Sequence, residues 1–153
     1  MTTTTTLKES LRADLTAAMK SGDKVKAGTI RMALSAITNE EVAGKVARQL
    51  SDAEVVAVLT REQKKRREAA EAFQTAGRAE QAALEQAEGE ILAGYLPKQL
   101  TDEELGELVR AAVAESGATT PREMGLVMKV LTPKIAGRAE GGRVASAVKG
   151  ALS

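Results

Sequence analysis

A cluster of basic residues near the C-terminus is the part of this chain whose residue types most suggest a function. From Met124 to the end, the sequence holds five Lys or Arg residues and one acidic residue, Glu140, so this segment has a net charge of +4. The five cations are Lys129, Lys134, Arg138, Arg143 and Lys149. Because Lys and Arg side chains contact phosphates without reading base sequence, the cluster predicts contact with an RNA backbone.

Three glycines, Gly137, Gly141 and Gly142, lie among these cations. Glycine reaches backbone conformations that other residues avoid, so we expect a tight, basic turn here. The turn leads into a predicted helix, and the N–H groups at the start of a helix attract anions, so the glycines are candidates for close approach to a phosphate. The alternative interpretation is that the cations are only the solvated faces of two amphipathic helices.

Two short amphipathic helices are predicted around this turn. Their apolar residues recur at helical spacing, first at Met124, Val127, Met128 and Leu131, then at Val144, Val148 and Leu152. Pro133 is expected to end the first of them, because proline lacks the N–H that a helix needs and clashes with the preceding turn. The predicted cationic surface therefore depends on two helices and the loop between them.

The rest of the sequence also predicts helices and no strands. Strong helix formers dominate it, aromatic residues make up only 1% of it, and its cores must therefore be aliphatic. We expect an all-α chain with a four-helix, bundle-like domain in residues 1–97 and a smaller three-helix domain in residues 98–153. Capping boxes at Ser51–Glu54 and Thr101–Glu104 mark two of the helix starts.

Two details of the first domain can be predicted from helical spacing. The apolar stripe of the longest helix is interrupted by Glu62 and Arg66, so either the stripe is solvated there or these two side chains pair beside the core. In the fourth helix, the apolar residues expected to face inward are Leu84, Ala87, Ile91 and Tyr95. A separate cation, Arg31, is expected to pair with Glu62 or Glu90.

Composition argues against several classes of catalyst. The chain has no Cys and no His, which removes the thiol nucleophile, the thiolate metal ligand and the commonest general base. It has no phosphate-binding loop motif of the G-x-x-x-x-G-K-[ST] type. We therefore expect no catalytic residues, no metal site and no cofactor. Short apolar runs and the lack of a basic-then-apolar N-terminus predict no membrane contact and a cytoplasmic location.

Several stretches together resemble the GatB/YqeY family, in which small YqeY-like proteins are related to the C-terminal tail of the GatB subunit of tRNA-dependent amidotransferase. The stretches are Asp23-Lys24, Ile30-Arg31-Met32, Arg61 to Arg66, Glu90-Ile91-Leu92, Tyr95 to Leu100, Met124 to Met128, Pro133-Lys134 and Gly137 to Gly141. They extend over nearly the full length. One departure is Glu140, where the family often has Asp.

The resemblance implies an N-terminal helical bundle with a smaller helical domain after it. It also implies a link to tRNA and to carbon–nitrogen ligase activity with glutamine as amide donor. Since the residues for such chemistry are missing, we expect an accessory role and no intrinsic ligase activity. The expected partners are tRNA and an amidotransferase or tRNA-charging enzyme subunit. The alternative is a protein–protein adaptor that docks on an enzyme subunit without contacting RNA, which predicts an uncovered apolar stripe on the C-terminal helices.

Overall fold

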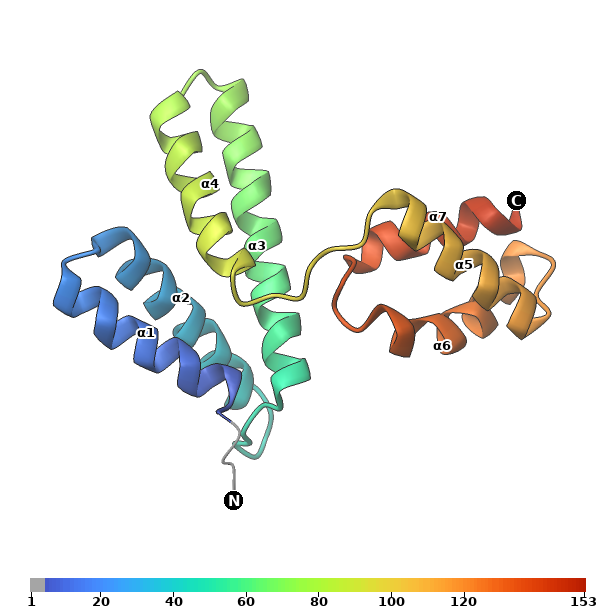
Figure 1. The fold of residues 1–153 in the computed structure, drawn as a ribbon, viewed down its shortest axis with the longest axis horizontal. Helices are drawn as coiled ribbons and strands as arrows, with labels where there is room; N and C mark the ends of the chain where they lie inside the picture. The colour runs from blue at the N-terminus through green and yellow to red at the C-terminus, as the bar shows by residue number, and fades with distance from the viewer. Residues whose placement is uncertain (1–4) are drawn as a thin grey trace. The chain divides into compact units, whose positions relative to one another are not determined.

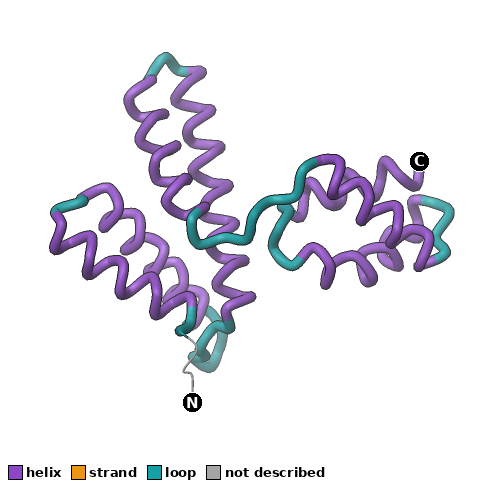
Figure 2. The backbone as a smooth tube through the Cα atoms, in the orientation of Figure 1, coloured by secondary structure: helices purple, strands orange, loops and turns teal. Residues whose placement is uncertain are grey.

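The structure is a computed structural model that describes residues 5–153, and within that range every residue lies in a helix or a loop (Figure 2). The prediction of an all-α chain is confirmed. The helices, in chain order, are α1 (Leu7–Ser21), α2 (Lys24–Glu41), α3 (Asp52–Thr75), α4 (Ala79–Ala93), α5 (Asp102–Ser116), the short 3₁₀ helix η1 (Pro121–Glu123), α6 (Met124–Ile135) and α7 (Gly141–Leu152). None of these helices is long and apolar enough to cross a membrane.

Side-chain caps set the starts of four helices, α1, α2, α3 and α5. The Thr6 hydroxyl accepts from the Glu9 N–H at the start of α1, and Asp23 does the same for Lys26 at the start of α2. Both predicted capping boxes are present, at Ser51–Glu54 before α3 and at Thr101–Glu104 before α5. Each cap satisfies an N–H group that the first turn of a helix leaves without a partner, so these polar residues fix where each helix begins.

The chain separates into two compact units, one ending at Leu96 and the other running from Pro97 to Ser153. In the first unit, α1 packs on α2 and α3 packs on α4, which makes two helical hairpins. Figure 1 shows that these hairpins lie close together near the start of α3 and spread apart toward their other ends. The four helices therefore share a core over only part of their length.

That shared core is aliphatic, as the shortage of aromatic residues requires. Side chains from all four helices are buried in it: Leu11, Ile30, Ala33, Ile37, Val55, Val58, Leu59 and Leu92. Tyr95, the single Tyr of the chain, packs against its edge, and its hydroxyl donates a hydrogen bond to Asp14 of α1. Tyr95 thus fixes the point at which the chain leaves the first unit.

Arg66 of α3 resolves the two alternatives for the interrupted stripe. It is only 8% exposed, and its Nη1 lies 2.9 Å from Glu62 Oε2, so the pair lies beside the core. Its Nε lies 3.6 Å from Glu88 Oε2 of α4. The expectation that Arg31 pairs with Glu62 or Glu90 is wrong, because the Arg31 guanidinium donates to the sulfur of Met19.

The predicted inward face of α4 is wrong at Leu84, which is 47% exposed. The residues of α4 that are buried are Ala82 and Leu92. Small residues line this contact with α3, where Ala70 is buried and an added Cβ at Gly89 would lie 3.9 Å from Arg66 Cβ. Helices that meet through small residues approach closely and do not need a large apolar side chain at the contact, so hydrophobicity alone indicated the wrong face.

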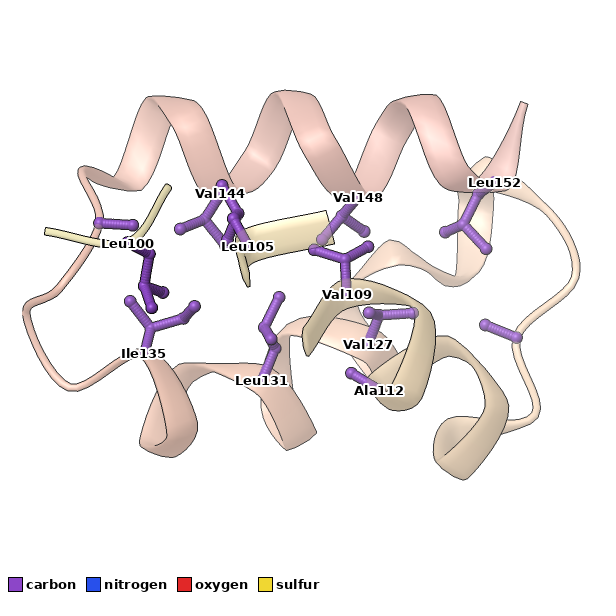
Figure 3. Packing of buried hydrophobic residues seen from close by; sticks show 12 residues of the cluster. Leu100, Leu105, Val109, Ala112, Val127, Leu131, Ile135, Val144, Val148 and Leu152 are labelled. Carbon is purple, nitrogen blue, oxygen red and sulfur yellow. The ribbon is translucent and has the colours of Figure 1, made fainter. Parts of the chain in front are cut away.

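The second unit has a core of its own, formed between α5, α6 and α7. In Figure 3, Val144 and Val148 of α7 point into this core from one side, and Val127 and Leu131 of α6 point into it from the other. The buried set is Leu100, Leu105, Val109, Ala112, Ala118, Val127, Leu131, Ile135, Ala139, Val144, Val148 and Leu152. The apolar stripes predicted for α6 and α7 are therefore covered within this unit.

The predicted stop at Pro133 is wrong, because α6 continues through it to Ile135. Pro133 lies in the last turn, where the missing N–H removes one hydrogen bond and no further turns have to be built on it. The helix ends instead at Ala136, with φ 47°, and Gly137, with φ 79°. Two successive residues in the left-handed region cannot continue a right-handed helix, and glycine adopts this region readily.

The hydrogen bond from Tyr95 to Asp14 is expected to stabilise the first unit. Burial, and next the bond to Asp14, raise the pKa of Tyr95 well above its usual value, so the hydroxyl is a donor at all ordinary pH values. Tyr95→Phe should lower the free energy of unfolding by about 1 kcal/mol, measured by urea denaturation and circular dichroism. Asp14→Asn keeps an acceptor and should cost less. Equal stability of Tyr95→Phe and wild type would contradict this role.

Glu41 should make the first unit sensitive to acid. Its pKa is lowered, first by the hydrogen bond from Lys8 and next by the Leu50 N–H. Because the folded-state pKa lies below the unfolded one, the stabilisation is present above the ordinary carboxyl pKa and is lost as pH falls through the folded value. Glu41→Gln should thus be less stable than wild type at neutral pH, with a difference that shrinks on acidification.

Urea denaturation at a series of pH values measures this dependence. Glu40→Gln is a suitable control, because the Glu40 side chain is 42% exposed and its Oε2 lies 3.4 Å from Arg61 Nη2 in a surface ion pair. A Glu41→Gln difference that stayed constant from neutral to acid pH would show that the Lys8 pair does not carry the effect.

Candidate nucleic-acid interface

The five predicted cations are distributed over α6, α7 and the loop that joins them. Lys129 and Lys134 belong to α6, Arg138 to the loop, and Arg143 and Lys149 to α7. The apolar stripes of both helices face the core. Burial of these aliphatic side chains fixes the rotation of each helix about its own axis, and this rotation decides which way the cationic side chains point. Their environments differ, and the difference separates structural cations from exposed ones.

Arg138 stabilises the end of α6. Its Nη2 donates to the Lys134 carbonyl oxygen at 2.6 Å, and its Nε donates to that of Ile135 at 3.2 Å. The last carbonyls of a helix have no partner within the helix and carry partial negative charge, so a guanidinium there is favourable. Two of the five N–H donors of Arg138 are therefore used inside the second unit.

Arg143 ties the start of α7 to the segment before α5. Its Nη2 donates to the Leu100 carbonyl oxygen at 3.0 Å and to Asp102 Oδ1 at 2.9 Å. Leu100 in turn donates its N–H to the Arg138 carbonyl oxygen at 2.7 Å. The backbone of Leu100 thus joins the two arginines, and these are the two predicted cations that the structure brings together.

The side chains of the three lysines have other surroundings than those of the two arginines. Lys134 forms an ion pair with Glu115 of α5, with its Nζ 2.9 Å from Glu115 Oε2. Lys129 is exposed and, at helical spacing, lies on the side of α6 opposite Val127 and Leu131. Lys149 is exposed on α7. The two exposed lysines are consequently the predicted cations with the most open ammonium groups.

A further basic residue near the arginine junction, Lys98, was not among the predicted site residues. The pKa of Glu104 is lowered chiefly by hydrogen bonds from Thr101, and the charges of Lys98 and Arg138 lower it further, which locates both cations near this carboxylate. Gln99 next to Lys98 donates to the Gly137 carbonyl oxygen at 3.2 Å. The sequence signal for Lys98 was its place directly before a capping box, far along the chain from the other cations.

The predicted glycine turn is partly wrong. Gly137 does form a turn, with a positive φ of 79°, whereas Gly141 and Gly142 are the first residues of α7. The Glu140 side chain provides no cap for this helix, so its first N–H groups are not satisfied in that way. However, a Cβ at Gly142 would lie 3.5 Å from Glu140 Oε1, so a carboxylate already lies beside the helix start. A phosphate approaching these glycines would meet that negative charge.

Acidic and basic residues are distributed unevenly along the second unit. Residues 97–123 contain six acidic and three basic residues, whereas the segment from Met124 onward contains five basic residues and one acidic residue. Within residues 5–153, no three acidic side chains are grouped so that they could hold a metal ion. The arrangement can attract and position an anion through exposed lysines, and it offers no nucleophile with an adjacent base.

The fold and the site define a small helical protein of two units whose second unit carries a cationic C-terminal half. A model of the YqeY-like protein family matches residues 8–152 of the chain, and the chain belongs to that family. The resemblance to YqeY-like proteins inferred from the sequence is thereby confirmed. No curated protein matches the chain.

The different environments of Arg143 and Lys149 lead to a prediction about stability. Arg143→Ala should lower the free energy of unfolding by about 1 kcal/mol, because it removes a hydrogen bond to a backbone carbonyl and a surface ion pair. Lys149→Ala should leave it within about 0.5 kcal/mol of wild type, as is usual for an exposed side chain. Thermal and urea denaturation of both variants test this, and equal losses would contradict a structural role for Arg143.

Proposed function

We propose that the protein is an RNA-binding accessory module that contacts tRNA through exposed lysines of α6 and α7 and acts with the machinery that amidates tRNA using glutamine as nitrogen donor. The cytoplasm is the proposed compartment. The observation that carries the RNA part is the net charge of +4 on the segment from Met124 onward, with Lys129 and Lys149 exposed on it. The amidation part rests on the family resemblance.

The proposed contact is electrostatic and independent of base sequence. Lysine ammonium groups bind phosphate oxygens as point charges, and such contacts position a protein on RNA without reading it. No aromatic side chain is available in the second unit to stack on bases, since Phe73 and Tyr95 both precede it. We therefore propose weak binding that depends strongly on salt and that recognises RNA by shape.

An accessory role fits the residues better than catalysis does. Release of ammonia from glutamine needs an activated nucleophile, and the chain has neither Cys nor His. The carboxylates of α5 are spread along the first turns, where the Thr101 N–H donates to Glu104 Oε1 and Arg143 Nη2 donates to Asp102 Oδ1. The proposal consequently assigns ligase chemistry to a partner enzyme.

The protein–protein adaptor remains the second candidate, and the structure offers it less support. An adaptor of this kind was expected to leave the apolar stripes of the C-terminal helices uncovered, but Val127, Leu131, Val144 and Val148 are all buried within the second unit. Among the large hydrophobic residues of this unit that the structure describes, the exposed one is Leu126, at 50%. A single exposed Leu is common on protein surfaces and does not by itself indicate a partner.

Titration of labelled tRNA at several salt concentrations tests the proposal. The double variant Lys129→Ala/Lys149→Ala should bind more weakly than wild type at low salt, and the slope of log affinity against log salt should fall by about 2, roughly one for each lost phosphate contact. Circular dichroism and thermal denaturation establish that the variant keeps its fold.

The matched control is Lys20→Ala/Lys24→Ala, which removes the same charge from exposed positions of the first unit. This control should bind tRNA as wild type does. Absence of binding at low salt would reject the proposal, and so would equal loss of affinity in the two double variants, since any cation would then serve. Binding of the partner enzyme that persists after RNA is digested would favour the adaptor.

A further inference from the structure

Methionine provides all of the sulfur chemistry available to this chain, because the sequence contains five Met and no Cys. Met1 lies outside the described residues. Met124 and Met128 are half-buried against the core of the second unit, whereas Met19 is 48% exposed and Met32 is 38% exposed. The Met side chains of the first unit are therefore more open to an oxidant in solution than those of the second.

The sulfur atoms of Met19 and Met32 both lie against a guanidinium group. Arg31 Nη2 of α2 donates to Met19 Sδ of α1 at 3.0 Å, and Arg66 Nη2 of α3 donates to Met32 Sδ of α2 at 2.7 Å. Arg31 and Met32 are neighbours in α2, so this helix donates a hydrogen bond to α1 and accepts one from α3. The two contacts link α1, α2 and α3.

The two guanidinium groups differ in their freedom to move. Arg31 is exposed. Arg66 is buried, with Nη1 bonded to Glu62 and Nε lying 3.6 Å from Glu88 without a hydrogen-bond partner of its own. The exposed Arg31 can move with a change at its sulfur, while Arg66 is held by two partly buried carboxylates.

From this geometry we propose that Met32 is a reversible oxidation site, where conversion to the sulfoxide by a peroxide loosens the junction between the two hairpins of the first unit. In the reaction, a sulfur lone pair attacks one peroxide oxygen, the S–O bond forms and the O–O bond breaks. The other oxygen takes the proton and leaves as water. Sulfur loses two electrons and the peroxide gains them.

The consequence follows from the space around the sulfur. With Arg66 Nη2 only 2.7 Å from Met32 Sδ, no room exists for an oxygen atom between them. Because Arg66 is held by Glu62 and Glu88, the oxidised Met32 has to leave the contact. Oxidation replaces an apolar thioether by a polar group in any case, so the packing of α2 against α3 weakens there. At Met19, the exposed Arg31 has room to turn and donate to the new oxygen.

Hydrogen peroxide treatment of the full chain, with peptide mapping by mass spectrometry and thermal denaturation, tests the proposal. Met19 and Met32 should be oxidised before Met124 and Met128. The Tm should fall by about 5 °C, the size expected when a small domain loses one interaction of hydrogen-bond strength. Reduction by methionine sulfoxide reductases should restore the Tm.

Two matched variants separate the sites. After peroxide treatment, Met32→Leu should keep its Tm, whereas Met19→Leu should lose as much as wild type. Hydrogen exchange of oxidised wild-type protein gives a readout that does not depend on a variant folding, and faster exchange should be confined to α2 and α3. Oxidation of Met32 no faster than that of Met128, an equal loss of Tm in Met32→Leu, or faster exchange only in the second unit would each overturn the proposal.

Discussion

Burial of aliphatic side chains has to stabilise both units of this chain almost alone, since aromatic residues are 1% of the sequence and disulfides are impossible without Cys. Leu, Ile, Val and Ala fill both cores, and the α3–α4 contact is made through Ala70, Ala82 and Gly89. Small side chains bury little area each, so helices have to approach closely to gain enough stabilisation. Close approach in turn excludes water from the few charged groups that remain inside, above all Arg66.

The limited core also explains how the cations of the second unit are used. Arg138 and Arg143 hold the loop between α6 and α7 to the backbone of Leu100, and Lys134 pairs with Glu115. These contacts are local polar reinforcements of a small unit whose apolar burial is modest. They leave fewer ammonium and guanidinium groups available to an anion than the formal charge of the segment indicates, which is why exposure rather than charge identifies the residues to test.

Helix positions could be predicted well from the sequence because the signals are local. Thr6, Asp23, Ser51 and Thr101 cap helices through bonds to residues three positions away, and the stripes of α5, α6 and α7 follow from helical spacing. The errors lie where contacts between helices decide which residues are buried, and Leu84, which was predicted to face inward but is exposed, is one example. The end of α6 beyond Pro133 depended on a positive φ at Ala136, a residue that gives no such signal. The charge cluster was visible in the sequence, whereas its division into bonded and exposed cations needed three-dimensional contacts.

The closed core of the second unit has an evolutionary implication. A segment that buries its own apolar residues can be joined to a different protein by gene fusion, because it exposes no large apolar surface either alone or in the fusion. The twelve buried residues from Leu100 to Leu152 meet this condition, because they come from the second unit alone. Such a segment is portable, because attaching it to another chain would uncover none of these residues.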